Sequence, residues 1–238
     1  MRQIDLVLQK RSLSRLNCAL CANIRDWLLK QVSDELAQLI NTPNDLCMFS
    51  LFSRVQQSNI ALRLSFLHED AVPLWEAARS AQIIDIADFD GGIAVLDRVD
   101  KLVVSLEQLC KPAPKCFRII LASPATNPNR GEPPNFYALP ALLSTAAHKL
   151  MKYESVKISS DELNEICSLV SYSRYDLRTE EYTIDQGKPC QGFVGNLLLR
   201  PGGTSAQRDK LAFLLRYAAY AGIGAKTDLG MGGILLME

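Results

Sequence analysis

The sequence predicts an α+β protein built from two similar halves, each with the element order strand, helix, strand, strand, helix, strand. Three observations predict this fold class. Short segments with alternating apolar residues, typical of strands, are separated by longer segments with apolar residues at helical spacing. This order occurs twice, on either side of a proline-rich segment at 111–114. With 238 residues, 48% of them hydrophobic, the chain can bury one large core or two modest ones.

The first half begins with alternating residues and continues with leucine, isoleucine and tryptophan at helical spacing. Pro43-Asn44-Asp45 ends this helical region, because proline and asparagine favour turns. The elements predicted here are a strand at 4–8, a helix at 13–28, strands at 47–51 and 60–66, a helix around 74–78 and at least one strand within 83–95.

The alternating prolines of Lys111-Pro112-Ala113-Pro114 continue neither a helix nor a central strand, so the domain boundary is expected there. The elements predicted beyond it are a strand at 116–121, a helix at 139–151, strands at 166–172 and 193–199 with a long polar connection between them, a helix at 205–220 and a strand at 234–237. We therefore expect two tandem ferredoxin-like (RRM-like, βαββαβ) domains, at 1–112 and 113–238.

Composition excludes several classes of protein. The 26 basic and 26 acidic residues cancel, so a broadly basic surface for non-specific nucleic-acid binding is excluded and any such site must be local. No apolar stretch reaches the roughly 18 residues of a membrane span, and Met1-Arg2-Gln3 leads directly into a strand instead of a signal peptide. Seven scattered cysteines fit reduced thiols. We expect a cytoplasmic protein that does not bind membranes.

A glycine-rich loop at 222–232 is the most informative segment. It carries Gly222, Gly224, Gly230 and Gly232 between an apolar helix and an apolar strand, and Gly233 follows directly. Dinucleotide-binding loops follow a strand and open a helix, which is the opposite order. A P-loop is also excluded, because its lysine follows a glycine directly, whereas Lys226 does not, and because no helix follows. The loop can offer backbone N–H donors and one lysine to a polyanion, and a simple helix-to-strand turn is the alternative.

The spacing glycine, hydrophobe, glycine, five residues, glycine, hydrophobe, glycine resembles the C-terminal motif of RAMP proteins of CRISPR systems, and more narrowly the repeat-processing endoribonucleases of the Cas-six type. Gln191–Gly195 and Tyr220–Thr227 resemble the family's segments before and after its last helix. The resemblance implies binding of CRISPR repeat RNA and metal-independent cleavage of precursor crRNA. In that reaction a 2′-OH attacks the adjacent phosphate and leaves a 2′,3′-cyclic phosphate, and the protein stays bound to the crRNA 3′ handle.

The resemblance also locates candidate catalytic residues, because such proteins usually carry a histidine on the first long helix or just beyond it. The corresponding positions hold Arg25 and Asn41. Arginine stays protonated, so it can stabilise a phosphorane but is a poor general base. His68 is expected at a solvated turn and His148 on a polar helix face. The alternative function is a catalytically inactive crRNA-binding subunit of a CRISPR effector complex, with other subunits as partners.

The residues expected to contact RNA lie in the loop and in two other segments. Arginine alternating with tyrosine from Tyr172 to Arg178 suits base stacking and phosphate binding, and an edge strand with cross-strand aromatic pairs is an equal alternative. The full set is Gly222, Gly224, Lys226, Thr227, Gly230, Gly232, Arg174, Tyr175, Arg178 and Arg130. No cofactor is expected. No metal site is expected either, since Cys18 and Cys21 lack two further ligands at suitable spacing.

Overall fold

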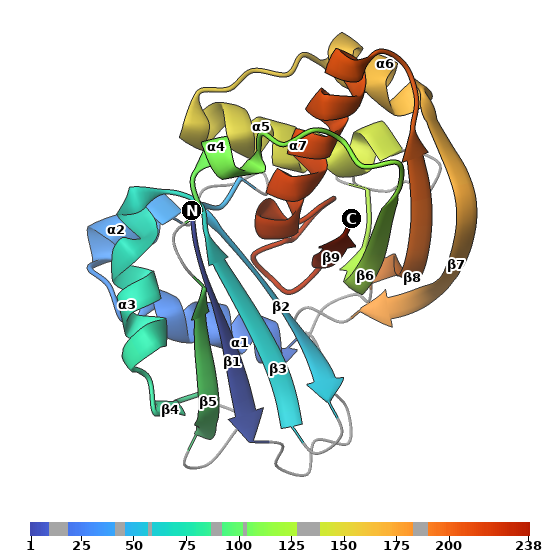
Figure 1. The fold of residues 1–238 in the computed structure, drawn as a ribbon. Coiled ribbons are helices and arrows are strands. Elements are labelled where there is room, and N and C mark those ends of the chain that lie inside the picture. The colour runs from blue at the N-terminus through green and yellow to red at the C-terminus, as the bar shows by residue number, and fades with distance from the viewer. Residues whose placement is uncertain are drawn as a thin grey trace.

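A computed structural model of the chain shows two antiparallel sheets, each packed against its own helices (Figure 1). The structure describes residues 1–9, 19–40, 46–56, 59–86, 92–101, 104–127, 139–182 and 190–238. The first sheet and its helices lie in the blue to green part of the chain, and the second in the green to red part. The two antiparallel sheets confirm the predicted α+β class.

The first sheet has the strand order β2-β3-β1-β5-β4. Its strands are β1 (Arg2–Gln9), β2 (Phe49–Gln56), β3 (Asn59–Phe66), β4 (Ile83–Ile84) and β5 (Ile93–Lys101). The helices of this half are α1 (Ala19–Leu29), α2 (Asp34–Ile40) and α3 (Val72–Ser80), with a 3₁₀ turn, η1 (Glu69–Ala71), before α3. Strand β1 is central, and its buried residues Ile4 and Leu6 lie opposite Leu64 and Leu62 of β3.

The second sheet has the strand order β7-β8-β6-β9. Its strands are β6 (Phe117–Ala125), β7 (Val170–Tyr182), β8 (Cys190–Pro201) and β9 (Ile234–Met237). The helices of this half are α5 (Leu139–Glu154), α6 (Ser160–Ser168) and α7 (Ser205–Ala221), and the short α4 (Leu106–Leu109) lies between the halves. Strand β6 is central and pairs with both β8 and β9.

The two sheets share one topology. In the first, β1 lies between β3 and β5, β2 is at the edge beyond β3, and the two-residue β4 pairs with β5 at the other edge. In the second, β6 lies between β8 and β9, and β7 is at the edge beyond β8. A helix connects the first strand to the second, and another connects the third to the fourth. This is the βαββαβ ferredoxin-like arrangement, so the predicted repeat of one fold is confirmed.

One stretch differs from the prediction. Residues 166–168, expected to start a strand, end helix α6, and the strand begins at Val170. It continues as β7 through residues 173–182, the first part of the expected polar connection. The helix begins at the Ser159 cap, whose hydroxyl accepts from the Glu162 N–H, and it buries Leu163, Ile166 and Cys167 on one face. Strand β7 lacks a run of buried apolar residues because it is an edge strand with mostly exposed side chains.

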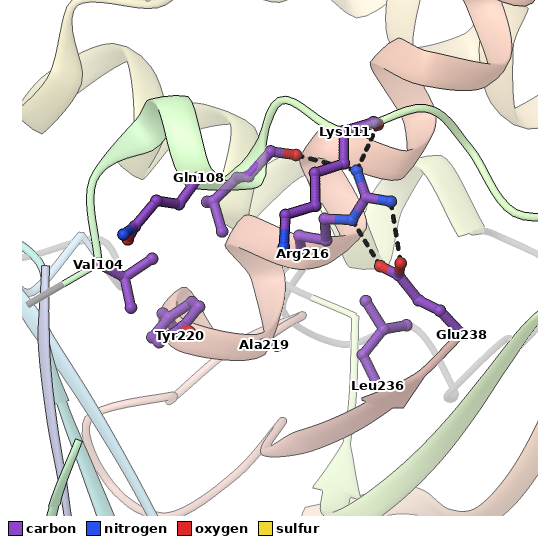
Figure 2. A pocket seen from close by; sticks show the side chains of 9 residues that line it. Val104, Gln108, Lys111, Arg216, Ala219, Tyr220, Leu236 and Glu238 are labelled. Atoms are coloured by element: carbon purple, nitrogen blue, oxygen red, sulfur yellow. Dashed lines mark hydrogen bonds and ion pairs between the residues drawn. The ribbon is translucent and has the colours of Figure 1, made fainter. Parts of the chain in front are cut away.

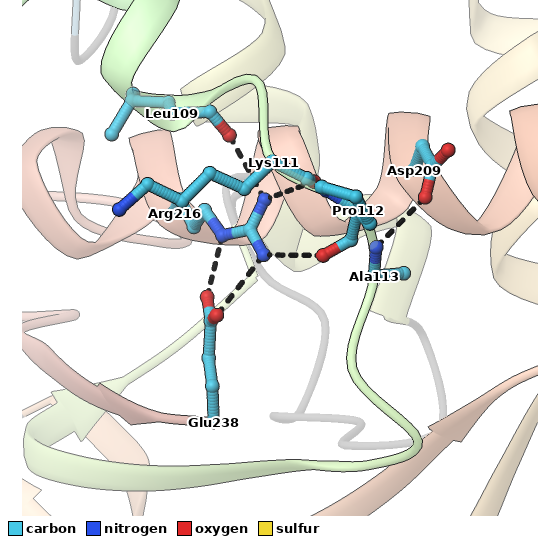
Figure 3. Close-up of polar contacts among 7 residues, drawn as sticks. All are labelled: Leu109, Lys111, Pro112, Ala113, Asp209, Arg216 and Glu238. Carbon is cyan, nitrogen blue, oxygen red and sulfur yellow. Dashed lines mark hydrogen bonds and ion pairs between the residues drawn. The ribbon is translucent and has the colours of Figure 1, made fainter.

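The segment between the halves is held by Arg216 of α7. Its guanidinium donates to the carbonyl oxygens of Leu109 (2.9 Å), Lys111 (2.6 Å) and Pro112 (3.0 Å) and pairs with the Glu238 carboxylate after β9 (Figure 3). Figure 2 shows the pocket of about 480 Å³ beside this cluster, where α4, α7 and β9 meet. We propose that the domain boundary lies between Pro112 and Ala113, within the segment that Arg216 fixes.

The halves also meet through β2. The Leu51 N–H donates to the carbonyl oxygen of Thr227 (2.9 Å), and the Ser50 hydroxyl donates to the carbonyl oxygen of Tyr220. Both acceptors lie at or just after the end of α7, so the first sheet of one half contacts the loop that follows the last helix of the other. This contact places the glycine-rich loop between the two halves.

Candidate functional site

The glycine-rich loop is folded tightly on itself. Gly222 caps the C-terminal end of helix α7, and its N–H donates to the carbonyl oxygen of Ala218 (2.8 Å). Further on, the N–H of Gly224 donates to the carbonyl of Leu142 (2.7 Å), and that of Gly232 to the carbonyl of Pro124 (2.8 Å). These backbone amides are therefore engaged inside the protein, where they join the loop to α5 and β6.

Two glycines of the loop permit close approach that a side chain would block. A Cβ on Gly224 would collide with the carbonyl oxygen of Thr126, and Gly224 has a φ of +68°. A Cβ on Gly230, where φ is +96°, would collide with the hydroxyl of Tyr182 and lie 2.6 Å from the Cβ of Cys21. Glycine is needed at both positions, since L side chains rarely adopt positive φ and no space is left. The packing explains these glycines without RNA, and an RNA contact remains a separate prediction.

A buried lysine supports the loop from α5. Lys149 is fully buried, and its ammonium donates to the carbonyl oxygen of Ala221 (3.1 Å) and to the hydroxyl of Thr227 (2.6 Å). The cation thus lies at the C-terminal end of α7, where the helix dipole favours positive charge. Thr227, one of the predicted RNA contacts, is also fully buried. Sequence reasoning missed Lys149, because its position on α5 resembles that of any lysine near a helix face.

Helix α1 of the first half contacts the same loop. The Nε of Arg25 donates to Oδ2 of Asp228 at 3.0 Å, and the two side chains are only 15% and 12% exposed. Cys21, one turn earlier on α1, lies against Gly230. Arg25, the candidate catalytic residue, is thereby placed at the glycine-rich loop. Asp228 was missed by sequence reasoning, which had no signal for a pair 203 residues apart.

The charged side chains beside the loop shift the pKa of one buried thiol, that of Cys47. Burial and, to a smaller extent, the Asp228 carboxylate raise the pKa of Cys47 to about 12. The cations of Lys149, Arg25 and Lys152 oppose that shift. Cations from α1 and α5 and the carboxylate of the loop therefore all lie within electrostatic reach of Cys47.

Lys226 and Tyr182 complete the described surroundings of the loop. Lys226 has a φ of +59°, uncommon for a residue with a side chain, and its ammonium lies 3.6 Å from the Cys190 sulfur. The Tyr182 hydroxyl donates to the carbonyl oxygen of Leu229 (3.2 Å). Because Tyr182 is the last residue of β7 and Cys190 the first of β8, these contacts bring the end of that hairpin to the loop.

The other candidates on β7 lie away from this end. Tyr175 is 56% exposed, and Arg178 forms an exposed ion pair with Glu180 (2.7 Å). Arg174 lines a shallow pocket of about 390 Å³ together with Arg118 and Asn196. A strand advances roughly 3.4 Å per residue, so Arg174 lies roughly 27 Å along the strand from Tyr182. The structure therefore does not bring Arg174 together with the loop.

Several sequence candidates lie outside the described residues or away from the loop. Asn41, Arg130 and Cys18 lie outside the described residues. His68 lies at the turn before η1, where its Nδ1 accepts from the Asp70 N–H and its ring faces Tyr153. His148 is exposed on α5.

Metal-ligand clusters and membrane spans were sought over the same ranges. Within the described ranges, no group of three or more His, Cys, Asp or Glu side chains lies together as metal ligands would. No helix in the described part of the chain combines the length and hydropathy needed to cross a bilayer.

The model of the family described as CRISPR-associated endoribonuclease Cas6 matches residues 113–234, just over half of the chain. The chain belongs to the Cas6 family. A CRISPR-associated endoribonuclease Cas6 of Streptococcus thermophilus is 26% identical over 127 residues, which are 51% of this chain and 51% of that protein. The match thus spans about half the length of this curated relative. The Cas6 domain includes the whole glycine-rich loop, and the resemblance drawn from that loop is confirmed.

Solved structures resemble the whole chain. A Cas6 product complex has a TM-score of 0.79 at 20% identity and covers 100% of this chain and 99% of its own. The Thermus thermophilus Cas6 has a TM-score of 0.70 at 18% identity, and the match covers 99% of this chain and 98% of that one. A structure described as a RAMP protein binding different RNA substrates reaches 0.64 at 15%, with full coverage of both chains. The tandem fold is therefore that of Cas6 and RAMP proteins over both halves.

Proposed function

We propose that this Cas6 chain binds CRISPR repeat RNA at the glycine-rich loop and cuts precursor crRNA there by a metal-independent reaction. The observation that carries the proposal is the convergence of Arg25 from the first half on the loop of the second. It brings a protonated guanidinium to the segment that carries the family motif. Some of the structural neighbours are described as product and substrate-mimic complexes, which agrees with an RNA site in this fold.

The proposed reaction is an internal transesterification. The 2′-oxygen attacks the adjacent phosphorus, the 5′-oxygen of the next nucleotide leaves, and the product ends in a 2′,3′-cyclic phosphate. One proton leaves the 2′-OH and one is gained by the 5′-oxygen. The phosphorane formed on the way carries extra negative charge, which nearby cations stabilise more strongly than the starting phosphate. Arg25 and Lys226 are the residues we assign to this charge stabilisation, because both are cations near the loop.

Binding is proposed to extend beyond the reacting phosphate. Gly222, Gly224, Gly230 and Gly232 are proposed to hold the loop in the shape that presents Lys226 to the RNA. Exposed Arg174, Tyr175 and Arg178 on β7 suit a flanking single strand, since aromatic rings stack on bases and guanidinium groups bind phosphates. A site of this extent retains its product, so we propose that the protein stays bound to the crRNA 3′ handle.

A specific observation favours a second candidate, a non-cleaving crRNA-binding subunit of an effector complex. The helix expected to carry the usual histidine presents Arg25, and an arginine accepts no proton at neutral pH. The two histidines of the chain lie at the turn before η1 and on the exposed face of α5. Binding through the same loop needs no proton acceptor, so this candidate differs from the first only in chemistry.

The test is incubation of the purified chain with repeat RNA from its own CRISPR array in excess EDTA. The proposal expects tight binding and a single cut. Lys226→Ala should weaken binding by roughly tenfold and reduce its dependence on salt, because one phosphate contact is lost. Lys157→Ala, at an exposed position outside the loop, is the matched control and should bind normally. Tight binding without a cut over hours would select the second candidate.

A further inference from the structure

The ion pair between Arg25 and Asp228 places a carboxylate inside the loop proposed to receive RNA. Both side chains are largely buried, and the bond from Nε to Oδ2 is 3.0 Å long. A carboxylate near an RNA phosphate is repulsive unless a cation neutralises it. The position of Asp228 therefore needs a function of its own, because a neutral residue would suit a purely phosphate-binding loop better.

The residues on either side of Asp228 in the chain are held by contacts of their own. The preceding residue, Thr227, accepts from the Lys149 ammonium through its hydroxyl and from the Leu51 N–H through its carbonyl. Gly230, two residues later, is packed between Cys21 and Tyr182. The backbone on both sides of Asp228 is thus anchored to α5, β2, α1 and β7. A carboxylate on such a backbone has few orientations available and is a rigid partner for a long side chain.

We infer that Asp228 is a positioning residue that holds the Arg25 guanidinium at the reacting phosphate. This inference rests on the proposed function. An arginine side chain has four rotatable torsions, and fixing them costs conformational entropy. Asp228 accepts a hydrogen bond from Nε of Arg25, the guanidinium nitrogen nearest to helix α1 along the side chain, and so sets the plane of the guanidinium. The cost of ordering Arg25 is then met during folding and not in the transition state.

A positioning role differs from a general-base role in what it needs from residue 228. Positioning needs a hydrogen-bond acceptor for Nε, which an asparagine carbonyl oxygen supplies as well as a carboxylate does. A general base needs a group that takes up a proton, which asparagine does not do. Alanine supplies neither. Asp228→Asn and Asp228→Ala therefore separate the two roles. Asp228→Asn also leaves no large void.

The experiment measures the rate constant of cleavage under single-turnover conditions in EDTA. The protein is in excess over the RNA, at a concentration that saturates binding. The five proteins are the original chain, Asp228→Asn, Asp228→Ala, Arg25→Ala and the double variant Arg25→Ala/Asp228→Ala. A repeat RNA with one 2′-deoxy nucleotide at the cut reports binding separately from cleavage. Thermal unfolding checks that each variant is folded.

We expect Asp228→Ala and Arg25→Ala each to slow cleavage about 100-fold, the usual loss for one transition-state donor. Asp228→Asn should stay within about fivefold of the original rate, and affinity for the deoxy RNA should change less than about threefold in the folded Asp228→Asn and Asp228→Ala variants. The double variant should be no slower than Arg25→Ala, because residues that act as a unit are not additive.

Three results would overturn the inference. An Asp228→Ala protein that cuts at the original rate shows that Arg25 needs no positioning. A double variant with the product of the two single losses shows that the residues act independently. An Asp228→Asn protein as slow as Asp228→Ala shows that the charge or proton matters instead of the hydrogen bond. If the original chain does not cut, the proposed function itself fails, and the role of Asp228 with it.

Discussion

The ammonium of Lys149 on α5 donates to the hydroxyl of Thr227 in the glycine-rich loop, 2.6 Å away, in the interior of the protein. The same ammonium also holds the last carbonyl of α7, that of Ala221. One buried cation therefore joins α5, the end of α7 and the loop.

Replacing Lys149 by methionine should destabilise the protein and disorder the loop. The substitution keeps most of the side-chain volume but leaves two buried polar groups without their donor, at a cost of about 2 to 4 kcal/mol. Urea denaturation should show this loss, and RNA affinity should fall with it. Lys152→Met, at an exposed position on the same helix, should cost below about 1 kcal/mol. Equal effects of the two substitutions would contradict the supporting role of Lys149.

Gly224→Ala should destabilise the chain more than Gly203→Ala does. Both glycines have positive φ, so both substitutions carry backbone strain of about 1 kcal/mol. The added methyl at 224 meets the backbone oxygen of Thr126, whereas at 203 it meets the movable side chains of Gln207 and Leu169. The difference in melting temperature measures how much more the backbone clash at 224 costs than the side-chain contacts at 203. Similar melting temperatures would show that the loop yields easily at this point.

This packing also decides how RNA binding at the loop is tested. A bulky residue at 224 or 230 changes the fold of the loop, so weaker binding would not separate contact from misfolding. Lys226 avoids this difficulty because its side chain is half-buried and its backbone conformation is kept by alanine.

Arg216→Met should lower the free energy of unfolding by about 3 kcal/mol or more, since three carbonyl oxygens and a carboxylate lose a largely buried cation. Arg200→Met, at an exposed position on β8, is the control and should change stability by about 0.5 kcal/mol or less. Chemical denaturation at neutral pH compares the two. If the segment at 109–112 did not depend on Arg216, the two variants would have the same midpoint.

Alkaline pH should destabilise the protein through its buried thiols. Burial raises the pKa of Cys21 to about 11 and that of Cys47 to about 12, from an ordinary value of 9.0. Between pH 9 and 11 the unfolded chain releases these protons and the folded chain keeps them. The free energy of unfolding therefore falls as pH rises, by about 1.4 kcal/mol per pH unit for each thiol, and is unaffected below pH 9.

Denaturation at pH 8 and pH 10 measures this slope. Cys47→Ala should lose part of it, whereas Cys110→Ala should keep all of it because Cys110 is exposed. A slope that is the same in both variants would show that Cys47 ionises freely in the folded state.

The sequence predicted the repeated fold because strand and helix periodicity are local properties. It missed α6, whose last three residues, 166–168, it predicts as the start of a strand. The edge strand β7 agrees with one of the two alternatives that the alternating arginines and tyrosines of 172–178 left open. Arg25 became a candidate catalytic residue only through the family resemblance, and its contact with the loop was not predicted. Asp228 and Lys149 were not predictable, because pairing between α1, α5 and the loop depends on how the two halves pack.

The most direct test of the central claim is the chemistry of the cut end. The purified chain is incubated in EDTA with its repeat RNA, and with the same RNA carrying a 2′-deoxy nucleotide at the cut. The account predicts a single cut with a 2′,3′-cyclic phosphate on the first RNA, and binding without cleavage on the second. Cleavage of the deoxy RNA, or no cleavage of either RNA by bound protein, would contradict it.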